Sequence, residues 1–318
     1  METNRNVTAA GTQLQGAAGT QKKVRLIRVP FWLGGGKAGT DLGPEYIVKA
    51  GLMRKLRAMD IEVEDEIEVD CPVQPLLTGA PARIKYLPEV LEMSGLVGEQ
   101  VYRAAARDSF PLILGGDHSV AIGSLAGLTA HYENLGVIWF DAHGDLNTEE
   151  TTPSGNMHGM ALAIAIGKSN FKLTDIPGAG SLIKKENIVI IGARELDPGE
   201  RELIRSEGIA CFSMHEIDRL GIAAVIEKAL EIAGNGTDGI HVSFDLDCLD
   251  PREAAGVGTP VPGGLNYREA HFALELLSES KRVTSMDIVE VNPLLDYDRR
   301  TATLAVELAT SLLGKRIL

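Results

Sequence analysis

VIWFDAHGD (137–145) and VSFDLDCLDP (242–251) decide the fold, because each joins a short apolar run to a group of acidic residues. Similar apolar runs recur along the chain, at 24–32, 110–116, 187–193, 208–214 and 282–291. Segments with helical character separate these runs. Buried strands that alternate with helices are typical of a parallel sheet covered on both faces. The sequence therefore predicts an α/β fold with a mainly parallel sheet.

The chain divides into an expected leader and one expected domain. Residues 1–23 are rich in small and polar residues and have no apolar stretch, which favours a flexible leader over a secretory signal. Residues 24–318 show no repeat and no linker, so we expect a single domain there. IEVEDEIEV (61–69) alternates apolar and acidic residues, which predicts a half-exposed strand at an edge of the sheet. Helices are expected near 44–59, 85–108, 118–131, 158–168, 199–207, 221–233, 266–278 and 300–313.

The composition excludes several classes of protein. The formal net charge is -13, so the surface repels phosphate backbones and nucleic acid is not an expected partner. No apolar run is long enough to predict a membrane span, and no membrane partner is expected. The three cysteines, Cys71, Cys211 and Cys248, form no CxxC pair, which favours a reducing compartment. We therefore expect a cytoplasmic protein.

Acidic and histidine side chains occur where several predicted strands end. In an open parallel sheet, ligands bind beyond the carboxyl ends of the strands. Asp141, His143 and Asp145 alternate along the chain, so extended backbone would place all three on one face. Converging carboxylates repel one another strongly, and divalent metal ions remove that repulsion. The sequence therefore predicts a two-metal hydrolytic site built from His118, Asp141, His143, Asp145, Asp245 and Asp247.

The ligand types indicate the metal. Carboxylates mixed with imidazoles suit Mn²⁺, with Co²⁺, Ni²⁺ or Fe²⁺ as alternatives, and they differ from the thiolates of a structural zinc site. Six ligands are too many for one ion with an open position, so we expect two ions that share carboxylates. The alternative is that these residues only cap helices and turns, as Asp117 or Asp250 could. Two acidic groups and a histidine, each after an apolar run, favour the metal site.

The chain resembles the ureohydrolase superfamily over 24–318, in five motifs that occur in this order: GGDHS (115–119), DAHGDLNT (141–148), SGNMHGM (154–160), SFDLDCLDP (243–251) and DIVEVNP (287–293). The resemblance implies a three-layer α/β/α sandwich of the arginase/deacetylase type and two Mn²⁺ per subunit. It implies that His118, Asp141, Asp145 and Asp245 hold one ion. It implies that Asp141, His143, Asp245 and Asp247 hold the other. A hydroxide that bridges the ions would be the nucleophile.

The segment LNTEETTPSGNMHGM (146–160) is similar to the arginase branch of this superfamily. That likeness implies that a run of amide and hydroxyl donors binds the substrate's α-carboxylate, namely Asn147, Thr152, Ser154 and Asn156. RELDPGE (194–200) also resembles arginases, which implies that Asp197 and Glu200 bind the α-ammonium group. The residues alone support another interpretation of these two acids, a turn followed by the acidic first turn of a helix.

The resemblance also assigns the catalytic residues. It implies that His158 shuttles a proton to the leaving amine, a role that suits imidazole because its pKa lies near working pH. It implies that Glu290 pairs with the substrate guanidinium and that Asp145 orients the hydroxide. Thr259 would line the site. The chain departs from the family pattern at Ala161, Glu195 and Cys248, none of which is an expected ligand.

The expected reaction is the hydrolysis of L-arginine to L-ornithine and urea by a trimer or a hexamer of two trimers. A related ureohydrolase acting on agmatine or a guanidino acid is the nearest alternative. A dinuclear phosphoesterase is a more distant one, because no Arg or Lys cluster lies among the motifs to hold phosphate. A metal-binding subunit without activity is the third.

Overall fold

One parallel sheet forms the centre of the structure, a computed structural model that describes residues 23–75 and 83–316. In the described residues the sheet has eight strands in the order β2-β1-β3-β8-β7-β4-β5-β6, and every neighbouring pair is parallel. The predicted α/β fold is therefore confirmed. The strands are β1 (Lys23–Val29), β2 (Glu62–Glu68), β3 (Phe110–Gly115), β4 (Leu135–Phe140), β5 (Ile188–Ile191), β6 (Ala210–Phe212), β7 (Gly239–Asp245) and β8 (Val283–Val289).

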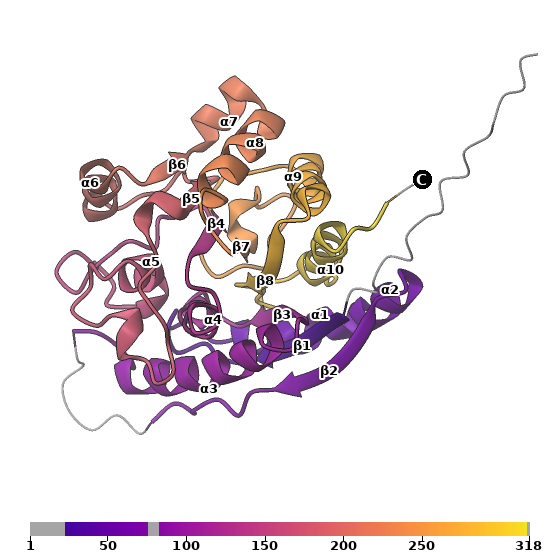
Figure 1. Cartoon of the computed structure of the whole chain (residues 1–318), viewed down its shortest axis with the longest axis horizontal. Helices are drawn as coiled ribbons and strands as arrows, with labels where there is room; N and C mark the ends of the chain where they lie inside the picture. The colour runs from indigo at the N-terminus through magenta and orange to yellow at the C-terminus, as the bar shows by residue number, and fades with distance from the viewer. Residues whose placement is uncertain (1–22, 76–82, 317–318) are drawn as a thin grey trace, which may run out of the picture.

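Helices cover both faces of the sheet and complete the three layers (Figure 1). Side chains alternate along each strand: Ile138 and Phe140 join the core on one face, and Val137 and Trp139 join the core on the other. The first core is covered by α1 (Gly43–Lys49), α2 (Leu52–Ala58), α7 (Met214–Leu220), α8 (Ile222–Ala233), α9 (Tyr267–Ser280) and α10 (Arg300–Leu312). The second is covered by α3 (Leu87–Ala105), α4 (Val120–Thr129), α5 (Ala161–Ala165) and α6 (Pro198–Glu207).

The structure differs from the sequence expectations in a few segments. The helix expected over 44–59 is two helices, because Gly51 has a φ of 106° and interrupts the first before α2 begins. The helix expected over 158–168 begins as a 3₁₀ turn (Met157–Met160) before the short α5. Helix α7 was not expected, although Ser213 and Glu216 form a capping box that marks its start. The expected leader lies outside the described residues except for Lys23, which begins β1.

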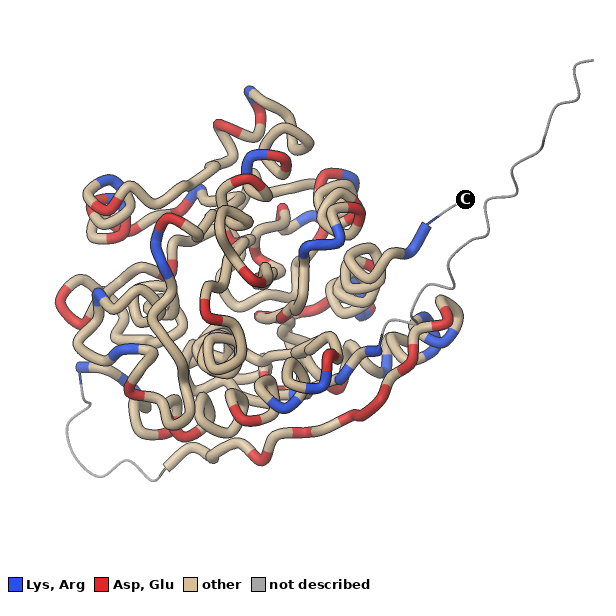
Figure 2. Tube along the Cα trace, in the orientation of Figure 1, with Lys and Arg blue, Asp and Glu red and all other residues tan. Residues whose placement is uncertain are grey.

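Strand β2 lies at the edge of the sheet and is strongly acidic, as Figure 2 shows. Its carboxylates pair with basic residues of β1: Arg25 lies 3.3 Å from Asp65, and Arg28 lies 2.7 Å from Glu68. A charged edge strand resists pairing with another chain. The edge position expected for 61–69 is confirmed. Among the residues that the structure describes, none of the helices combines the length and the apolar character that a membrane crossing requires.

Close packing of α3 against α4 fixes the helix that begins just after the predicted metal ligand His118. Gly127 of α4 lies against the α3 backbone, and a Cβ atom at this position would fall 2.3 Å from the carbonyl oxygen of Gly98. Gly95, also on α3, has no heavy atom within 4 Å of the corresponding position. The two glycines therefore respond differently to the same added methyl group.

We predict that Gly127→Ala lowers the free energy of unfolding by about 1–3 kcal/mol, because the helices must separate. Gly95→Ala is the matched control and should raise it by up to about 1 kcal/mol, since alanine favours the helix. Denaturant unfolding of the metal-free protein measures both. Equal stability of the two variants would contradict the close contact.

Candidate metal centre and active site

Four adjacent strands bring the predicted site residues to one edge of the sheet. In the sheet order, β3, β8, β7 and β4 are neighbours. His118 follows β3, Asp141 follows β4, Asp245 ends β7 and Glu290 follows β8. All these positions lie at the carboxyl ends of the strands, where parallel sheets bind ligands. Strand order thus explains how residues far apart in the sequence meet.

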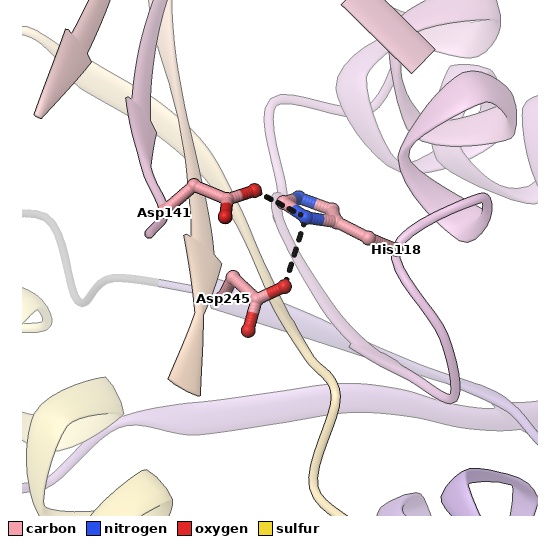
Figure 3. Close-up of side chains that lie close together, drawn as sticks. All are labelled: His118, Asp141 and Asp245. Atoms are coloured by element: carbon pink, nitrogen blue, oxygen red, sulfur yellow. Dashed lines mark ion pairs between the residues drawn. The ribbon is translucent and has the colours of Figure 1, made fainter. Parts of the chain in front are cut away.

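The first cluster surrounds the Nδ1 atom of His118 (Figure 3). Three carboxylate oxygens approach this atom: Oδ2 of Asp141 at 3.0 Å, Oδ2 of Asp145 at 3.1 Å and Oδ2 of Asp245 at 3.1 Å. All four side chains are buried. His118 Nδ1 and Asp145 Oδ2 nevertheless have no partner with hydrogen-bond geometry. Buried polar atoms without partners are rare, and a cation among them would satisfy both.

The second cluster surrounds the Nδ1 atom of His143, which is half-buried. Oδ1 of Asp141 and Oδ2 of Asp247 each lie 3.2 Å from this atom. Asp141 therefore faces both histidines, with a different oxygen toward each. Asp245 belongs to the first cluster alone, because its Oδ1 accepts a 2.7 Å hydrogen bond from the Asp247 amide. The six expected ligands thus form two clusters that share Asp141.

The electrostatics of the clusters reflect crowded negative charge. Burial raises the pKa of Asp245 well above its ordinary value, and the carboxylates of Asp247 and Asp141 raise it further. Burial and then Asp141 raise the pKa of Asp145 to about 7. Burial alone would lower the pKa of His118, but the surrounding carboxylates raise it well above 6.5. The clusters therefore hold protons unless another cation replaces them. Oxygen ligands with one imidazole each fit divalent ions of the manganese type.

Two further side chains orient these ligands and were not expected from the sequence. The Trp139 ring stacks on the His118 ring, with centroids 4.1 Å apart and planes 8° from parallel. Its Nε1 donates a 3.0 Å hydrogen bond to Asp141 Oδ2. Ser243 Oγ lies 2.8 Å from His118 Nε2. Each lies two residues before an expected ligand on the same strand, so alternation along the strand could have indicated them.

A cavity of about 110 Å³ lies beside the two clusters. It is lined by most of the expected site residues and also by Glu195, which sequence reasoning did not select: His143, Asp145, Asn147, Thr152, Ser154, His158, Glu195, Asp197, Glu200, Asp245, Asp247 and Thr259. Asn156 and Glu290 instead line a neighbouring cavity of about 260 Å³, to which His158 and Thr259 also contribute. The expected residues therefore gather around two adjoining cavities.

Hydrogen bonds fix the residues expected to bind the amino-acid end of the substrate. Asn147 Nδ2 donates to Asp197 Oδ2 at 2.8 Å. Glu200 accepts from the Leu146 amide at 3.1 Å and from the Asp197 amide at 2.8 Å. The second bond belongs to the capping box of α6, so the helix-start interpretation of these acids is correct as local structure. The same contacts also hold the 146–147 segment against α6.

His158, which is half-buried and lines both cavities, pairs with the buried Glu290. Nδ1 of His158 lies 3.1 Å from Glu290 Oε1, which also accepts a 3.0 Å hydrogen bond from the His118 amide. Burial alone would lower the pKa of His158, but Glu290 raises it to about 9. The imidazole therefore carries a proton at neutral pH. Thr259 Oγ1 donates to Asp247 Oδ2 at 2.9 Å and joins the second cluster to the cavity wall.

Comparison with known proteins identifies the family. A model described as the arginase family matches residues 22–314. The chain belongs to the arginase family. The arginase of Bacillus subtilis (strain 168) is 48% identical over 93% of this chain and 99% of that protein. The structure of the arginase of Bacillus caldovelox superposes with a TM-score of 0.90 at 46% identity and covers 94% of this chain and 100% of that one.

A solved structure of a protein with a different name is less similar to this chain. The proclavaminate amidino hydrolase of Streptomyces clavuligerus is 25% identical, with a TM-score of 0.72, and covers 92% of this chain and 91% of that one. The chain is therefore more similar to these two proteins named arginase than to that hydrolase. Its two His/Asp clusters are consistent with a dinuclear metal site.

We predict that Asp141→Ala removes both ions, because each oxygen of Asp141 faces a different cluster. His143→Ala is the comparison and should retain about one ion per chain, since His118 and its carboxylates are intact. Metal content after Mn²⁺ loading and gel filtration measures the difference. Retention of one ion by Asp141→Ala would show that the clusters do not depend on a shared carboxylate.

Proposed function

We propose that this chain is an arginase that hydrolyses L-arginine to L-ornithine and urea with two Mn²⁺ ions. The observation that carries the proposal is the pair of clusters that share Asp141 and border a cavity lined by both acidic side chains and amide and hydroxyl donors. The relatives named arginase support the substrate. Assembly as a trimer or hexamer belongs to the same proposal and is carried by the family resemblance.

The proposed ligand sets follow from the clusters. His118, Asp141, Asp145 and Asp245 would hold one ion, and Asp141, His143, Asp245 and Asp247 the other. Asp245 would belong to both ligand sets, although its Oδ1 accepts a hydrogen bond from the Asp247 amide in this structure. When bound, the ions supply Lewis acidity that lowers the pKa of water and stabilises developing negative charge. Co²⁺, Ni²⁺ or Fe²⁺ could fill the same ligand sets.

The protein's own residues would then bind, orient and transfer protons. Glu290 offers a planar carboxylate, which matches the planar guanidinium in shape and charge. Asp145, held beside His118, would accept a hydrogen bond from the attacking water and orient it. His158 carries a proton at neutral pH and would donate it to the leaving amine. Because Glu290 engages Nδ1 of His158, we assign the transfer to Nε2.

The substrate's amino-acid end would occupy the polar side of the cavity. Asn147, Thr152 and Ser154 line it and offer amide and hydroxyl donors for the α-carboxylate, and Asn156 lies close by in the neighbouring cavity. Asp197 and Glu200 supply negative charge for the α-ammonium group. Agmatine has no α-carboxylate, so these donors would distinguish L-arginine from it.

We predict that the Mn²⁺-loaded protein releases urea from L-arginine and releases little from agmatine or guanidinobutyrate. Removal of the metal with a chelator should abolish turnover, and adding Mn²⁺ back should restore it. A colorimetric urea assay over this panel, repeated with Co²⁺, Ni²⁺ and Fe²⁺, tests substrate and metal together. Faster urea release from agmatine would replace the proposal with an agmatinase, and inertness toward every guanidino compound would overturn it.

We predict that Asn147→Ala and Ser154→Ala each raise KM for L-arginine by about 10- to 100-fold, the effect of losing one hydrogen bond to a charged group. Asn170→Ala is the matched control, because Asn170 is exposed and bonds to Glu150 outside the cavity. Steady-state kinetics with L-arginine measures the change. Unchanged KM in both cavity variants would refute the carboxylate assignment.

A further inference from the structure

A buried network of hydrogen-bonded polar side chains lies beside the first His/Asp cluster, along β7 and β8. It begins at the ligand His118 and continues through Ser243, Asp287, His241 and Ser285, each of which is no more than 1% exposed. The two strands are neighbours, and their register pairs Ser243 with Asp287 and His241 with Ser285. Positions 241, 243 and 245 alternate, so His241 and Ser243 lie on the same face of β7 as the expected ligand Asp245.

Each side chain of this network is within hydrogen-bond distance of the next. His118 Nε2 lies 2.8 Å from Ser243 Oγ, and Ser243 Oγ donates to Asp287 Oδ1 at 2.6 Å. The other oxygen of Asp287, Oδ2, lies 3.0 Å from His241 Nε2. His241 Nδ1 lies 2.9 Å from Ser285 Oγ. Every side-chain nitrogen and oxygen of these four residues beyond His118 therefore has a partner.

The ionised carboxylate of Asp287 determines where the protons lie. Burial raises the pKa of Asp287, but His241 and the Ser243 hydroxyl bring it below its ordinary value. An ionised carboxylate only accepts hydrogen bonds, so the single hydroxyl proton of Ser243 is directed to Asp287. Ser243 Oγ is then left as an acceptor for His118. In its neutral, metal-binding form His118 therefore carries its proton on Nε2, which leaves the lone pair of Nδ1 for a cation among the three carboxylates.

We propose that Asp287, held by His241, is a positioning residue that fixes the tautomer and ring orientation of His118 through Ser243 and so strengthens binding of the ion that His118 holds. The inference rests on the proposed two-metal site. A carboxylate that is buried away from water needs hydrogen-bond partners to offset its lost hydration. The two oxygens of Asp287 have such partners in His241 and Ser243. Such outer contacts orient metal ligands and commonly change metal affinity by about 10- to 100-fold.

The test is the number and affinity of Mn²⁺ ions bound by the full-length metal-free protein, measured by calorimetric titration and by electron paramagnetic resonance. Wild-type protein should bind two ions per chain. Asp287→Asn removes the charge at nearly constant volume, and Ser243→Ala breaks the link to His118. Each should weaken one Mn²⁺ site by about tenfold or more and leave the other within about threefold. The double variant should be no worse than the weaker single variant, because both act through one path.

Ser311→Ala is the matched control. It removes a buried serine that lies outside the site and whose Oγ is 2.8 Å from His271 Nδ1. It should bind both ions as wild type does. A lower melting temperature of Asp287→Asn with both affinities unchanged would show a structural role only and overturn the inference. An equal loss at both sites would also overturn it. If Asp287→Asn does not fold, Ser243→Ala decides by the same criteria.

Failures of the inference and of the proposed function are distinguishable. Wild-type protein that binds fewer than two ions would overturn the two-metal site and this inference with it. Two-ion binding without urea release from L-arginine would overturn the substrate and leave the role of Asp287 to be judged from the affinities.

Discussion

The crowding of buried carboxylates at the carboxyl edge of the sheet is the constraint on which the rest of the site depends. Burial and repulsion raise the pKa values of Asp145, Asp245 and Asp247, so the chain alone tolerates this cluster only with protons or cations among the oxygens. The imidazoles of His118 and His143 face the carboxylates through single nitrogens. The fold supplies the rigidity, because strands β4 and β7 are hydrogen-bonded neighbours in the middle of the sheet. The site therefore follows from strand order as much as from residue identity.

Backbone strain accompanies this crowding. Asp145 has a φ of 50° and Glu290 a φ of 66°, both in the left-handed region that residues other than glycine rarely adopt. Such conformations cost on the order of 1–3 kcal/mol and persist where surrounding bonds hold them. The Asp145 carbonyl accepts from the Leu162 amide at 2.9 Å, and the Glu290 amide donates to the Gly116 carbonyl at 2.7 Å. The start of α5 and the end of β3 thus hold two strained residues against the metal clusters.

The sequence predicted the sheet well because strand positions depend on short-range spacing, and it also selected the His and Asp residues that the structure brings together in two clusters. Apolar runs mark the strands. The extended backbone expected through Asp141, His143 and Asp145 does not form, because the chain bends at 142–143 and Asp145 has a φ of 50°. The hydrogen-bonded network of Ser243, Asp287, His241 and Ser285 was not predicted, since it depends on which strands pair. The contact of His241 with Asp287 exists because β8 lies beside β7. Ser243 and Trp139 were also missed, although each lies two residues before an expected ligand, a spacing that could have indicated them.

Glu200 shows why local and functional interpretations need not compete. The sequence allowed it to be either the acidic first turn of a helix or a ligand for the substrate's ammonium group. In the structure its carboxylate accepts two backbone hydrogen bonds and also lines the cavity. Each carboxylate oxygen has a second lone pair, so capping does not exclude a further contact.

Capping also fixes the position of the Glu200 side chain. Its bond to the Leu146 amide ties the start of α6 to the segment that carries Asn147, and Asn147 in turn bonds to Asp197. The groups proposed for the α-carboxylate and the α-ammonium therefore form one connected unit, held at a set position relative to the metal clusters.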